Sequence, residues 1–268
     1  GGEMERLGFA GLLDRPASAA SAWDGFAITL AASGLLVLMV TVFPSLDLLI
    51  ARQFYTDGGH FVGEAGLISR GLRNVFIAVY FVGCGVCVAA LLITRDRVRS
   101  FLSISFAKWL FLALCLSIGP GVVANLALKD QLGRARPRDV VEFGGTQNFT
   151  AALVPSKECV RNCSFVCGES SSIFALFFAG ACLWRRWSMT MILSGLAAGG
   201  VAGLVRMSQG AHFLSDVVYS AVFMALSVLA LRWLFDAIAS SVQAEHDISP
   251  PDADGDITSF SRYEAAAE

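Results

Sequence analysis

Blocks of apolar residues alternate with polar segments along the chain. Six blocks stand out, at residues 26–43, 74–94, 109–128, 171–184, 189–205 and 217–235. Their apolar residues are continuous and do not follow amphipathic spacing. Most blocks are close to the roughly 17–25 residues that a helix needs to cross a bilayer, although the fourth is shorter. The pattern predicts an all-α integral membrane protein, with a six-transmembrane-helix bundle formed by residues 26–236.

Composition and the two ends of the chain fit this organisation. Hydrophobic residues make up 55% of the chain and charged residues 16%, whereas soluble domains average about 45–50% and about 25%. Residues 1–25 are expected to be cytoplasmic or interfacial, and the first block to be retained, since no small-residue cleavage pattern follows it. Residues 237–268 are acidic and contain a Pro-Pro pair, which predicts a disordered cytoplasmic tail.

The distribution of lysine and arginine predicts the orientation in the membrane. If six helices alternate, one side receives Arg6, Arg15, Arg95, Arg97, Arg99, Arg185 and Arg186. Positive residues in short loops favour the cytoplasmic side, which places both termini in the cytoplasm. The opposite side breaks this rule, because it carries Lys129, Arg134, Arg136, Arg138, Lys157 and Arg161. The formal net charge is only -2, so this positive charge is local. A bound anion explains it most simply, and no nucleic-acid partner is expected.

Three segments on this outward side carry candidate chemistry. The first, LKDQLGRARPRD, places Lys129 and Arg136 seven residues apart. On a continuing helix the two would share a face, although Pro137 favours an end to the helix before it. Lysine supplies a point charge and arginine a planar fork, which together suit phosphate oxygens. Anchoring to lipid headgroups is the alternative.

The second segment, NCSFVCGESSSIFALFF, opens an apolar helix. Gly168 precedes a run of serines, so Ser170 or a neighbour can cap the helix and leave backbone N–H groups facing an anion; ordinary capping explains the serines equally well. Glu169 at the membrane edge either pairs with cations or transfers protons. Upstream, Cys159 and Cys163 either form a disulfide, which an oxidising periplasm would permit, or remain free thiols.

The third segment, VRMSQGAHFLSDVV, carries Arg206, His212 and Asp216 between the last two apolar blocks. On a helix, His212 and Asp216 would be neighbours four residues apart. Asp216 can then accept a hydrogen bond from one imidazole nitrogen and leave the other as a nucleophile or base. Gly210 allows a turn before the helix. A structural histidine is the alternative, but the carboxylate and the two other cationic segments favour catalysis.

Taken together, the three segments resemble the type 2 phosphatidic acid phosphatase superfamily of membrane lipid phosphatases. The resemblance spans most of the chain, because FPSLDLLIARQFYTDGGHFV after the first block is also similar to bacterial members. It implies that His212 attacks phosphorus to form a phosphohistidine and that Asp216 orients it. Phosphate would be bound, without a metal or other cofactor, by Lys129, Arg136, Arg206 and the helix start formed by Cys167, Gly168 and Ser170.

The chain departs from the family pattern at two places. The second motif usually reads Pro-Ser-Gly-His, and the aligned residues here are Val166, Cys167, Gly168 and Glu169. A cysteine is a weaker hydrogen-bond donor than serine. Glu169 would have to replace histidine as the acid that protonates the leaving group, although nearby cations would lower its pKa. Val205 stands where the third motif usually begins with serine.

The segments CSFVCGE and RMSQGAHFLSD most resemble bacterial lipid A phosphatases, notably those acting at the 1-position, where the leaving group needs little protonation. The resemblance implies a hydrolase in the bacterial inner membrane whose site faces the periplasm and whose partners are membrane lipids and a lipid phosphate substrate. Alternatives are a lipid-to-lipid phosphotransferase, an undecaprenyl diphosphate or phosphatidylglycerophosphate phosphatase, and a non-catalytic lipid-binding or transport relative.

Overall fold

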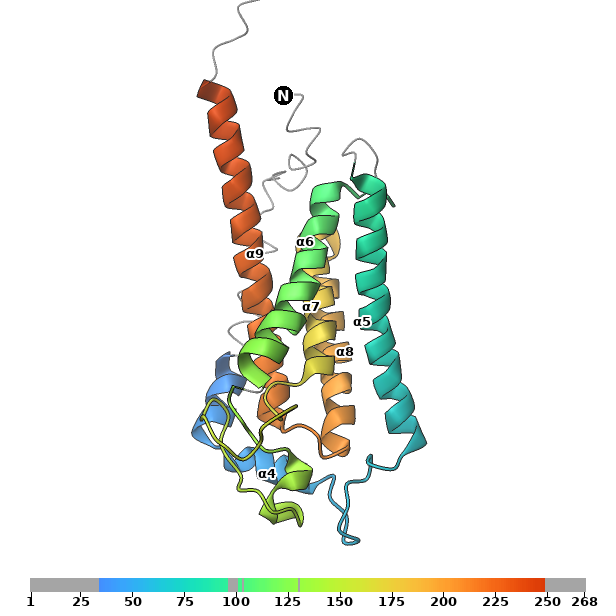
Figure 1. Cartoon of the computed structure of the whole chain (residues 1–268), viewed down its shortest axis with the longest axis vertical. Coiled ribbons are helices and arrows are strands. Elements are labelled where there is room, and N and C mark those ends of the chain that lie inside the picture. The colour runs from blue at the N-terminus through green and yellow to red at the C-terminus, as the bar shows by residue number, and fades with distance from the viewer. Residues whose placement is uncertain (1–33, 96–100, 103, 130, 249–268) are drawn as a thin grey trace, which may run out of the picture.

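The computed structural model describes residues 34–95, 101–102, 104–129 and 131–248. Within these ranges the protein is built from helices and contains no strands, as predicted (Figure 1). The principal helices are Gly34–Val42, α4 (Ser45–Arg52), α5 (Leu67–Thr94), α6 (Phe106–Leu116), the π-helix η1 (Ser117–Lys129), α7 (Gly168–Leu183), α8 (Ser188–Ser208) and α9 (Leu214–Ile248). Residues 1–25, expected to lie at the membrane surface, and residues 249–268 of the expected tail fall outside the described residues.

The described residues do not confirm the predicted number of six membrane spans. Four helical segments are long and apolar enough to cross a bilayer, and a fifth is counted if two bent helices form one span. That pair is Gly34–Val42 and α4, which meet at an angle of 94°. Pro44 stands at the bend, and a proline disfavours helical geometry in the residue before it. Helix α7 has 16 residues and is shorter than each of the four helical segments that could cross a bilayer.

Two helices differ from the apolar blocks that predicted them. Helix α5 begins at Leu67, after Gly66 in an extended conformation. Hydropathy excluded its first part because that part contains Arg70 and Arg73. Helix α9 continues to Ile248, into the segment expected to be disordered. It meets no glycine or proline until the Pro-Pro pair that follows, and proline stops a helix.

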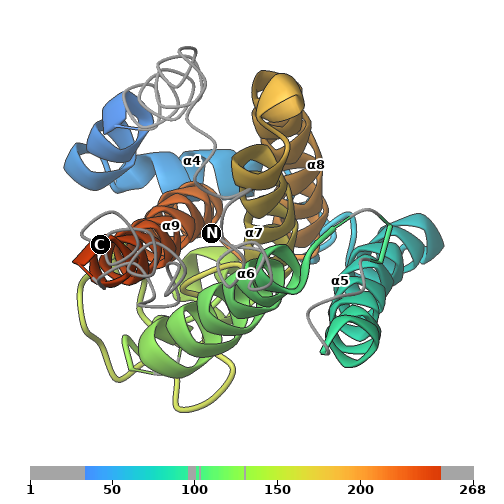
Figure 2. The same ribbon diagram turned by 90° about the horizontal axis from the view of Figure 1, so that it is seen from above.

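Helix α7 lies at the centre of the bundle, among α6, α8 and α9 (Figure 2). Its Phe174 and Phe178 are buried. Helix α8 approaches this face closely, because a Cβ at Gly195 or Gly199 would overlap the side chains of Phe177 or Phe174. Glycine at these two positions therefore lets α8 and α7 pack together, and each of these helices carries part of the site.

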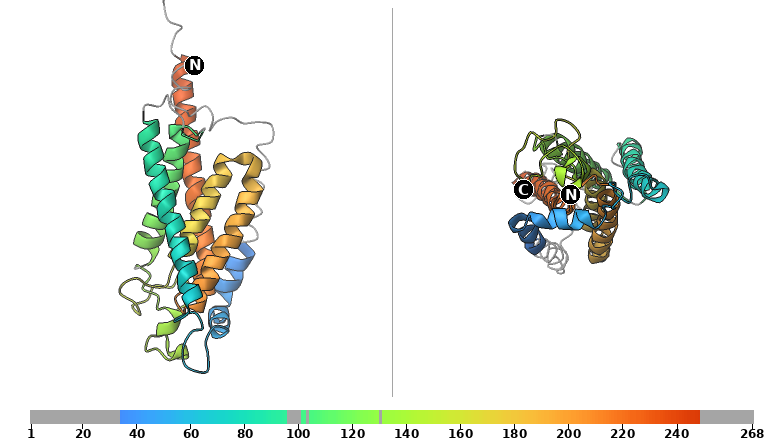
Figure 3. Two further views of the ribbon diagram at one scale, coloured as in Figure 1. Left: turned by 90° about the vertical axis from the view of Figure 1, so that its right-hand side faces the viewer. Right: turned by 90° about the horizontal axis from the view of Figure 1, so that it is seen from below.

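All segments predicted to carry chemistry meet at one end of the bundle. Helices α5, α7 and α9 begin there and η1 and α8 end there, at the bottom of Figure 1. The connection 131–167 folds over this end and includes two short 3-10 helices, η2 (Pro137–Asp139) and η3 (Val141–Phe143). Helix α4 lies across the start of α9 (Figure 3). The three segments therefore lie on one side of the bundle.

Candidate active site

His212 lies in the turn between α8 and α9 and not on a helix. Gly210 makes this turn with a φ of 60°, where a side chain would also overlap the ring of Phe61. The imidazole is 1% exposed, and its Nδ1 lies 2.6 Å from the backbone oxygen of Ser164. Nδ1 therefore carries a proton and donates it. Nε2 makes no hydrogen bond with any described residue, so its lone pair is available in the neutral ring.

The expected hydrogen bond between His212 and Asp216 does not form. Nδ1 of His212 and Oδ2 of Asp216 are 3.7 Å apart, because His212 precedes the first turn of α9. Asp216 instead accepts hydrogen bonds from the Ser164 hydroxyl at 2.5 Å and from the Phe213 amide at 2.8 Å. Asp216 thus fixes the imidazole indirectly, through the residue whose carbonyl binds it.

The charges around His212 act in opposite directions on its protonation. Burial lowers the pKa of His212, whereas the neighbouring Cys167 and Asp216 raise it, and the net shift is upward. A reaction that needs the neutral imidazole therefore loses rate as the pH falls below this raised pKa.

A buried arginine that the sequence analysis did not assign to the site holds Asp216 in place. Arg134 is 1% exposed and donates to Asp216 Oδ1 at 2.6 Å and to Asp47 Oδ2 at 2.7 Å. Its guanidinium lies 4.4 Å from the centre of the Phe213 ring. Burial lowers the pKa of Arg134, but Asp216 and Asp47 raise it further, so the group stays charged. This cation ties α4 to the start of α9.

Lys129 and Arg206 bring positive charge to the start of α7. Lys129 is the last residue of η1, and its Nζ lies 3.7 Å from where a Cβ on Gly168 would be. Arg206, near the end of α8, is buried and donates from Nη1 to Gln209 Oε1 at 2.5 Å. The two cations lie close enough for their charges to interact. A phosphate placed there would meet both of them.

Arg136 reaches the same region without sharing a helix face with Lys129. The backbone at Arg136 is extended, with φ -84° and ψ 156°, as the residue before Pro137 requires. Its Nε and Nη2 donate to the Asn162 carbonyl at 3.0 and 2.6 Å. Burial and the positive charges of Arg138 and Arg206 lower the pKa of Arg136 to about 10. The group is still charged at neutral pH, and it repels its neighbours.

Cys159 and Cys163 are joined by a disulfide in the structure. The bridge closes a short loop that contains Asn162. Because the Asn162 carbonyl holds the guanidinium of Arg136, the bridge restrains the loop that positions this cation.

The serines at the start of α7 do not act as expected. The N-cap residue is Cys167, and it makes no side-chain capping bond. The Ser170 hydroxyl donates to the Gly199 carbonyl of α8 at 3.0 Å, so it is engaged in helix packing and is not directed at a ligand. The expectation that the Ser170 side chain caps the helix is wrong, because the close approach of α8 offers it a different partner. The backbone N–H groups at a helix start remain suited to an anion.

Glu169 is paired with two arginines. Its Oε1 lies 2.9 Å from Nε of Arg73 and 3.2 Å from Nε of Arg206. A carboxylate between two guanidinium groups is stabilised in its ionised form and has no proton to donate. The pairing favours a role in which Glu169 positions Arg206.

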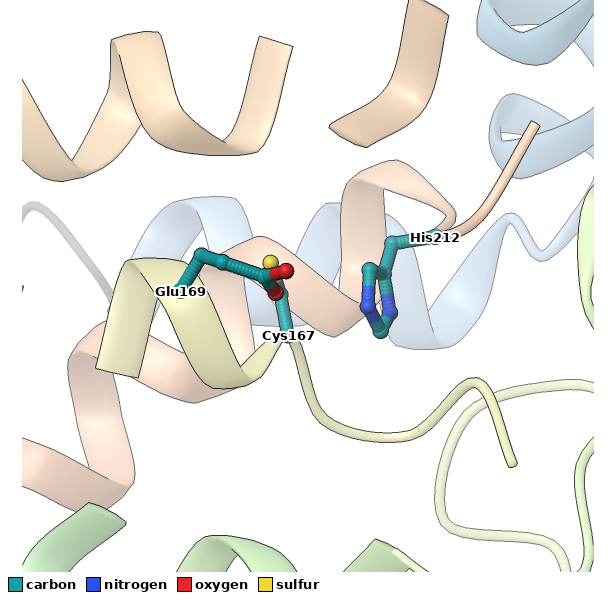
Figure 4. A group of neighbouring side chains, drawn as sticks. All are labelled: Cys167, Glu169 and His212. Atoms are coloured by element: carbon teal, nitrogen blue, oxygen red, sulfur yellow. The ribbon is translucent and has the colours of Figure 1, made fainter. Parts of the chain in front are cut away.

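Cys167, Glu169 and His212 form a group that could hold a metal ion. One ligand atom from each lies within 4.8 Å of the others, and Figure 4 shows Cys167 and Glu169 facing His212 from the start of α7. The donor set suits zinc. However, Glu169 is already paired with Arg73 and Arg206. These neighbouring cations oppose a metal ion and favour an anion.

A pocket of about 150 Å³ opens beside Arg206. We call it the mouth, and it is lined by Glu64, Arg70, Arg73, Arg138, Arg206 and Gln209. Arg206 belongs both to this pocket and to the cationic group around His212. The mouth therefore adjoins the cationic group around His212 through Arg206.

Comparison with known proteins agrees with this arrangement. Residues 106–239 match the PAP2 superfamily, which is half of the chain. The chain belongs to the PAP2 superfamily. It is thus a phosphatase, a hydrolase of phosphoric esters, as the three motifs implied.

Individual relatives extend the match beyond the family region. A lipid A 4'-phosphatase of Francisella tularensis subsp. novicida is 38% identical over 69% of this chain and 84% of its own length. A lipid A 4'-phosphatase of Rhizobium leguminosarum is 32% identical over 68% of this chain and 84% of its own length. A lipid A 1-phosphatase of Rhizobium johnstonii is 30% identical over 48% of each chain. No solved structure matched the chain.

The sequence analysis missed four residues that shape the site. They are Asp47, Arg73, Arg134 and Ser164. Asp47 carried a usable signal, because a carboxylate in the otherwise apolar segment SLDLLIA requires a partner. The contact of Ser164 with His212 uses its backbone, which no residue pattern reveals.

Replacing Asp47 tests whether the buried ion pairs support the site. Asp47→Asn leaves Arg134 with one carboxylate and weakens the bonds from the Ser215 amide and hydroxyl. We expect a loss of roughly 3–5 kcal/mol in stability, measured as a lower unfolding temperature in detergent, together with lower activity. Asp57→Asn, at an exposed position, is the control. Equal stability of the two variants would show that the network does not support the fold.

Proposed function

We propose that this protein is a membrane lipid phosphatase that removes a phosphate from lipid A through a phosphohistidine on His212. One observation carries the proposal. The buried His212 has its Nδ1 fixed by the Ser164 carbonyl, and its Nε2 makes no hydrogen bond in the part of the chain that the structure describes. Lys129, Arg136 and Arg206 all interact electrostatically with Glu169, whose carboxylate lies within 4.8 Å of a ring nitrogen of His212. An unpaired nucleophilic nitrogen beside three cations suits attack on a phosphate.

The proposed reaction has two steps. Nε2 attacks phosphorus, a phosphorus–nitrogen bond forms, the bond between phosphorus and the sugar oxygen breaks, and the sugar oxygen takes a proton from solvent water. Lys129, Arg136 and Arg206 neutralise the charge that grows on the phosphate oxygens. Water then attacks the phosphohistidine, and inorganic phosphate leaves with the restored imidazole. The cations supply the charge neutralisation that a metal ion supplies in other phosphoryl-transfer enzymes.

The relatives favour a position on the lipid that differs from the one the motifs indicated. Proteins named lipid A 4'-phosphatase match two thirds of this chain at up to 38% identity, whereas those named lipid A 1-phosphatase match about half at up to 30%. We therefore assign the 4'-phosphate as the substrate group. Its leaving group is an ordinary sugar hydroxyl and not an anomeric one.

The proposed site faces the periplasm. In the structure it lies at the end of the bundle where α5, α7 and α9 begin (Figure 1). Arg95 follows α5, and Arg185 and Arg186 lie between α7 and α8, at the opposite end. Positive residues favour the cytoplasmic side, so these arginines support an outward site. The domain division into residues 1–25, 26–236 and 237–268 and the cytoplasmic position of both termini stay predictions.

Replacing the proposed nucleophile is the direct test of function. In His212→Ala, we expect phosphate release from lipid A to fall roughly 10³-fold or more, while lipid binding is retained because the cations remain. His60→Ala, at an exposed histidine, is the matched control. Product analysis by mass spectrometry should show free phosphate and one dephosphorylated lipid. Unchanged phosphate release in His212→Ala would refute the mechanism.

Glu169→Gln distinguishes positioning from acid catalysis. If Glu169 positions Arg206, the variant should slow hydrolysis by the same factor, roughly 10–100-fold, for good and poor leaving groups. The rates of an aryl phosphate and a sugar phosphate check this, with Glu142→Gln, an exposed glutamate, as control. A much larger loss for the sugar phosphate would instead make Glu169 the acid.

A further inference from the structure

The mouth contains more positive charge than the reacting phosphate needs. Arg70 and Arg73 come from the first turns of α5, three residues apart and so on one side of the helix. Arg138 comes from η2 and Arg206 from α8. Three elements distant in sequence therefore direct arginines at one pocket, and a carboxylate, Glu64, also lines it.

The arginines of the mouth are held so that part of each guanidinium is available. Arg70 donates to the Ala65 carbonyl at 2.7 Å and to the Gly66 carbonyl at 3.4 Å, which uses two of its five N–H groups. Arg73 is bound to Glu169 through Nε, and its side chain is 43% exposed. The Arg138 side chain is 40% exposed, and its contact with Asp139, at 3.9 Å, is the one ion pair it makes within the described residues. The remaining N–H donors can bind an anion.

Arg138 is also attached to the turn that carries His212. Its backbone amide donates to the Gly210 carbonyl at 3.1 Å. Its positive charge helps to lower the pKa of Arg136 to about 10. The mouth and the proposed reaction centre are thus adjacent, with Arg206 shared between them.

A count of charges indicates what the two regions together can neutralise. Around the reaction centre and the mouth stand six cationic side chains and three carboxylates. They are Lys129, Arg136, Arg206, Arg70, Arg73 and Arg138, against Glu64, Asp139 and Glu169. Three positive charges are in excess, and a phosphate monoester brings about two negative charges at neutral pH. The positive charge that remains suits a second anionic group.

We propose that the mouth binds a second phosphate or carboxylate of the same substrate molecule, through Arg70, Arg73 and Arg138. This inference rests on the proposed function, because it takes the reacting phosphate to lie at His212. Guanidinium groups suit such anions, since they bind their oxygens in a planar fork. The names of the relatives refer to phosphates at two positions of lipid A, 1 and 4'. A lipid with both phosphates supplies the second anion from its own structure.

The test compares the binding of two lipids to a variant without the proposed nucleophile, so that hydrolysis does not interfere with the measurement. Dissociation constants of lipid A with two phosphates and of lipid A lacking the 1-phosphate are measured on His212→Ala protein in neutral detergent. We expect the diphosphorylated lipid to bind roughly tenfold more tightly. Adding Arg70→Gln and Arg138→Gln should remove this preference, because it weakens binding of the diphosphorylated lipid more than binding of the monophosphorylated lipid. Arg52→Gln, an exposed arginine at the same end, is the control.

The outcomes separate this inference from the proposed function. Equal binding of the two lipids, or a preference that survives both substitutions, overturns the second anion site. Anionic phospholipid that tightens binding of the monophosphorylated lipid and abolishes the preference would assign the mouth to neighbouring headgroups and also overturn it. Phosphate release from lipid A by unaltered protein is measured in parallel. Its absence refutes the proposed function, while the binding comparison still decides the second site.

Discussion

The ion pairs of Arg134 with Asp216 and Asp47 are the interaction on which the site depends. All three side chains are at most 1% exposed. A buried charge is costly unless it is paired and hydrogen-bonded, so each member requires the others. Asp216 accepts a hydrogen bond from the Ser164 hydroxyl and so holds Ser164 in place. The Ser164 carbonyl in turn accepts a hydrogen bond from Nδ1 of His212. The position of the proposed nucleophile is therefore set by a network that never contacts a substrate.

Around this fixed imidazole, the protein gathers cations that repel one another. Burial and the positive charges of Arg138 and Arg206 lower the pKa of Arg136, so part of this lowering comes from repulsion between the cations. Glu169 offsets some of it by pairing with Arg73 and Arg206. In the proposed mechanism, the phosphate supplies the missing negative charge. The same excess of positive charge therefore binds the phosphate and stabilises the transition state.

Sequence reasoning found the features that depend on local pattern. Long apolar blocks predicted the helices, and the spacing of Arg206, His212 and Asp216 indicated the family. It missed contacts that depend on tertiary structure. Asp47 and Arg134 lie 87 residues apart in the chain and pair only after α4 folds across α9.

Errors at element ends have similar physical causes. Ser170 was expected to cap α7, but the glycines of α8 bring a carbonyl within reach of its hydroxyl. Arg73 was left outside the second helix because hydropathy penalises charge, although the backbone of α5 includes it. His212 was placed on a helix because a four-residue spacing does not reveal where that helix starts.

The most direct test of the central claim is rapid quenching of the enzyme during turnover of lipid A that carries radiolabelled phosphate. The account predicts labelled protein whose label is stable in alkali, is released by acid and maps to His212, as a phosphorus–nitrogen bond requires. Label on a different residue would contradict the account. So would release of labelled phosphate with no labelled protein at any quench time.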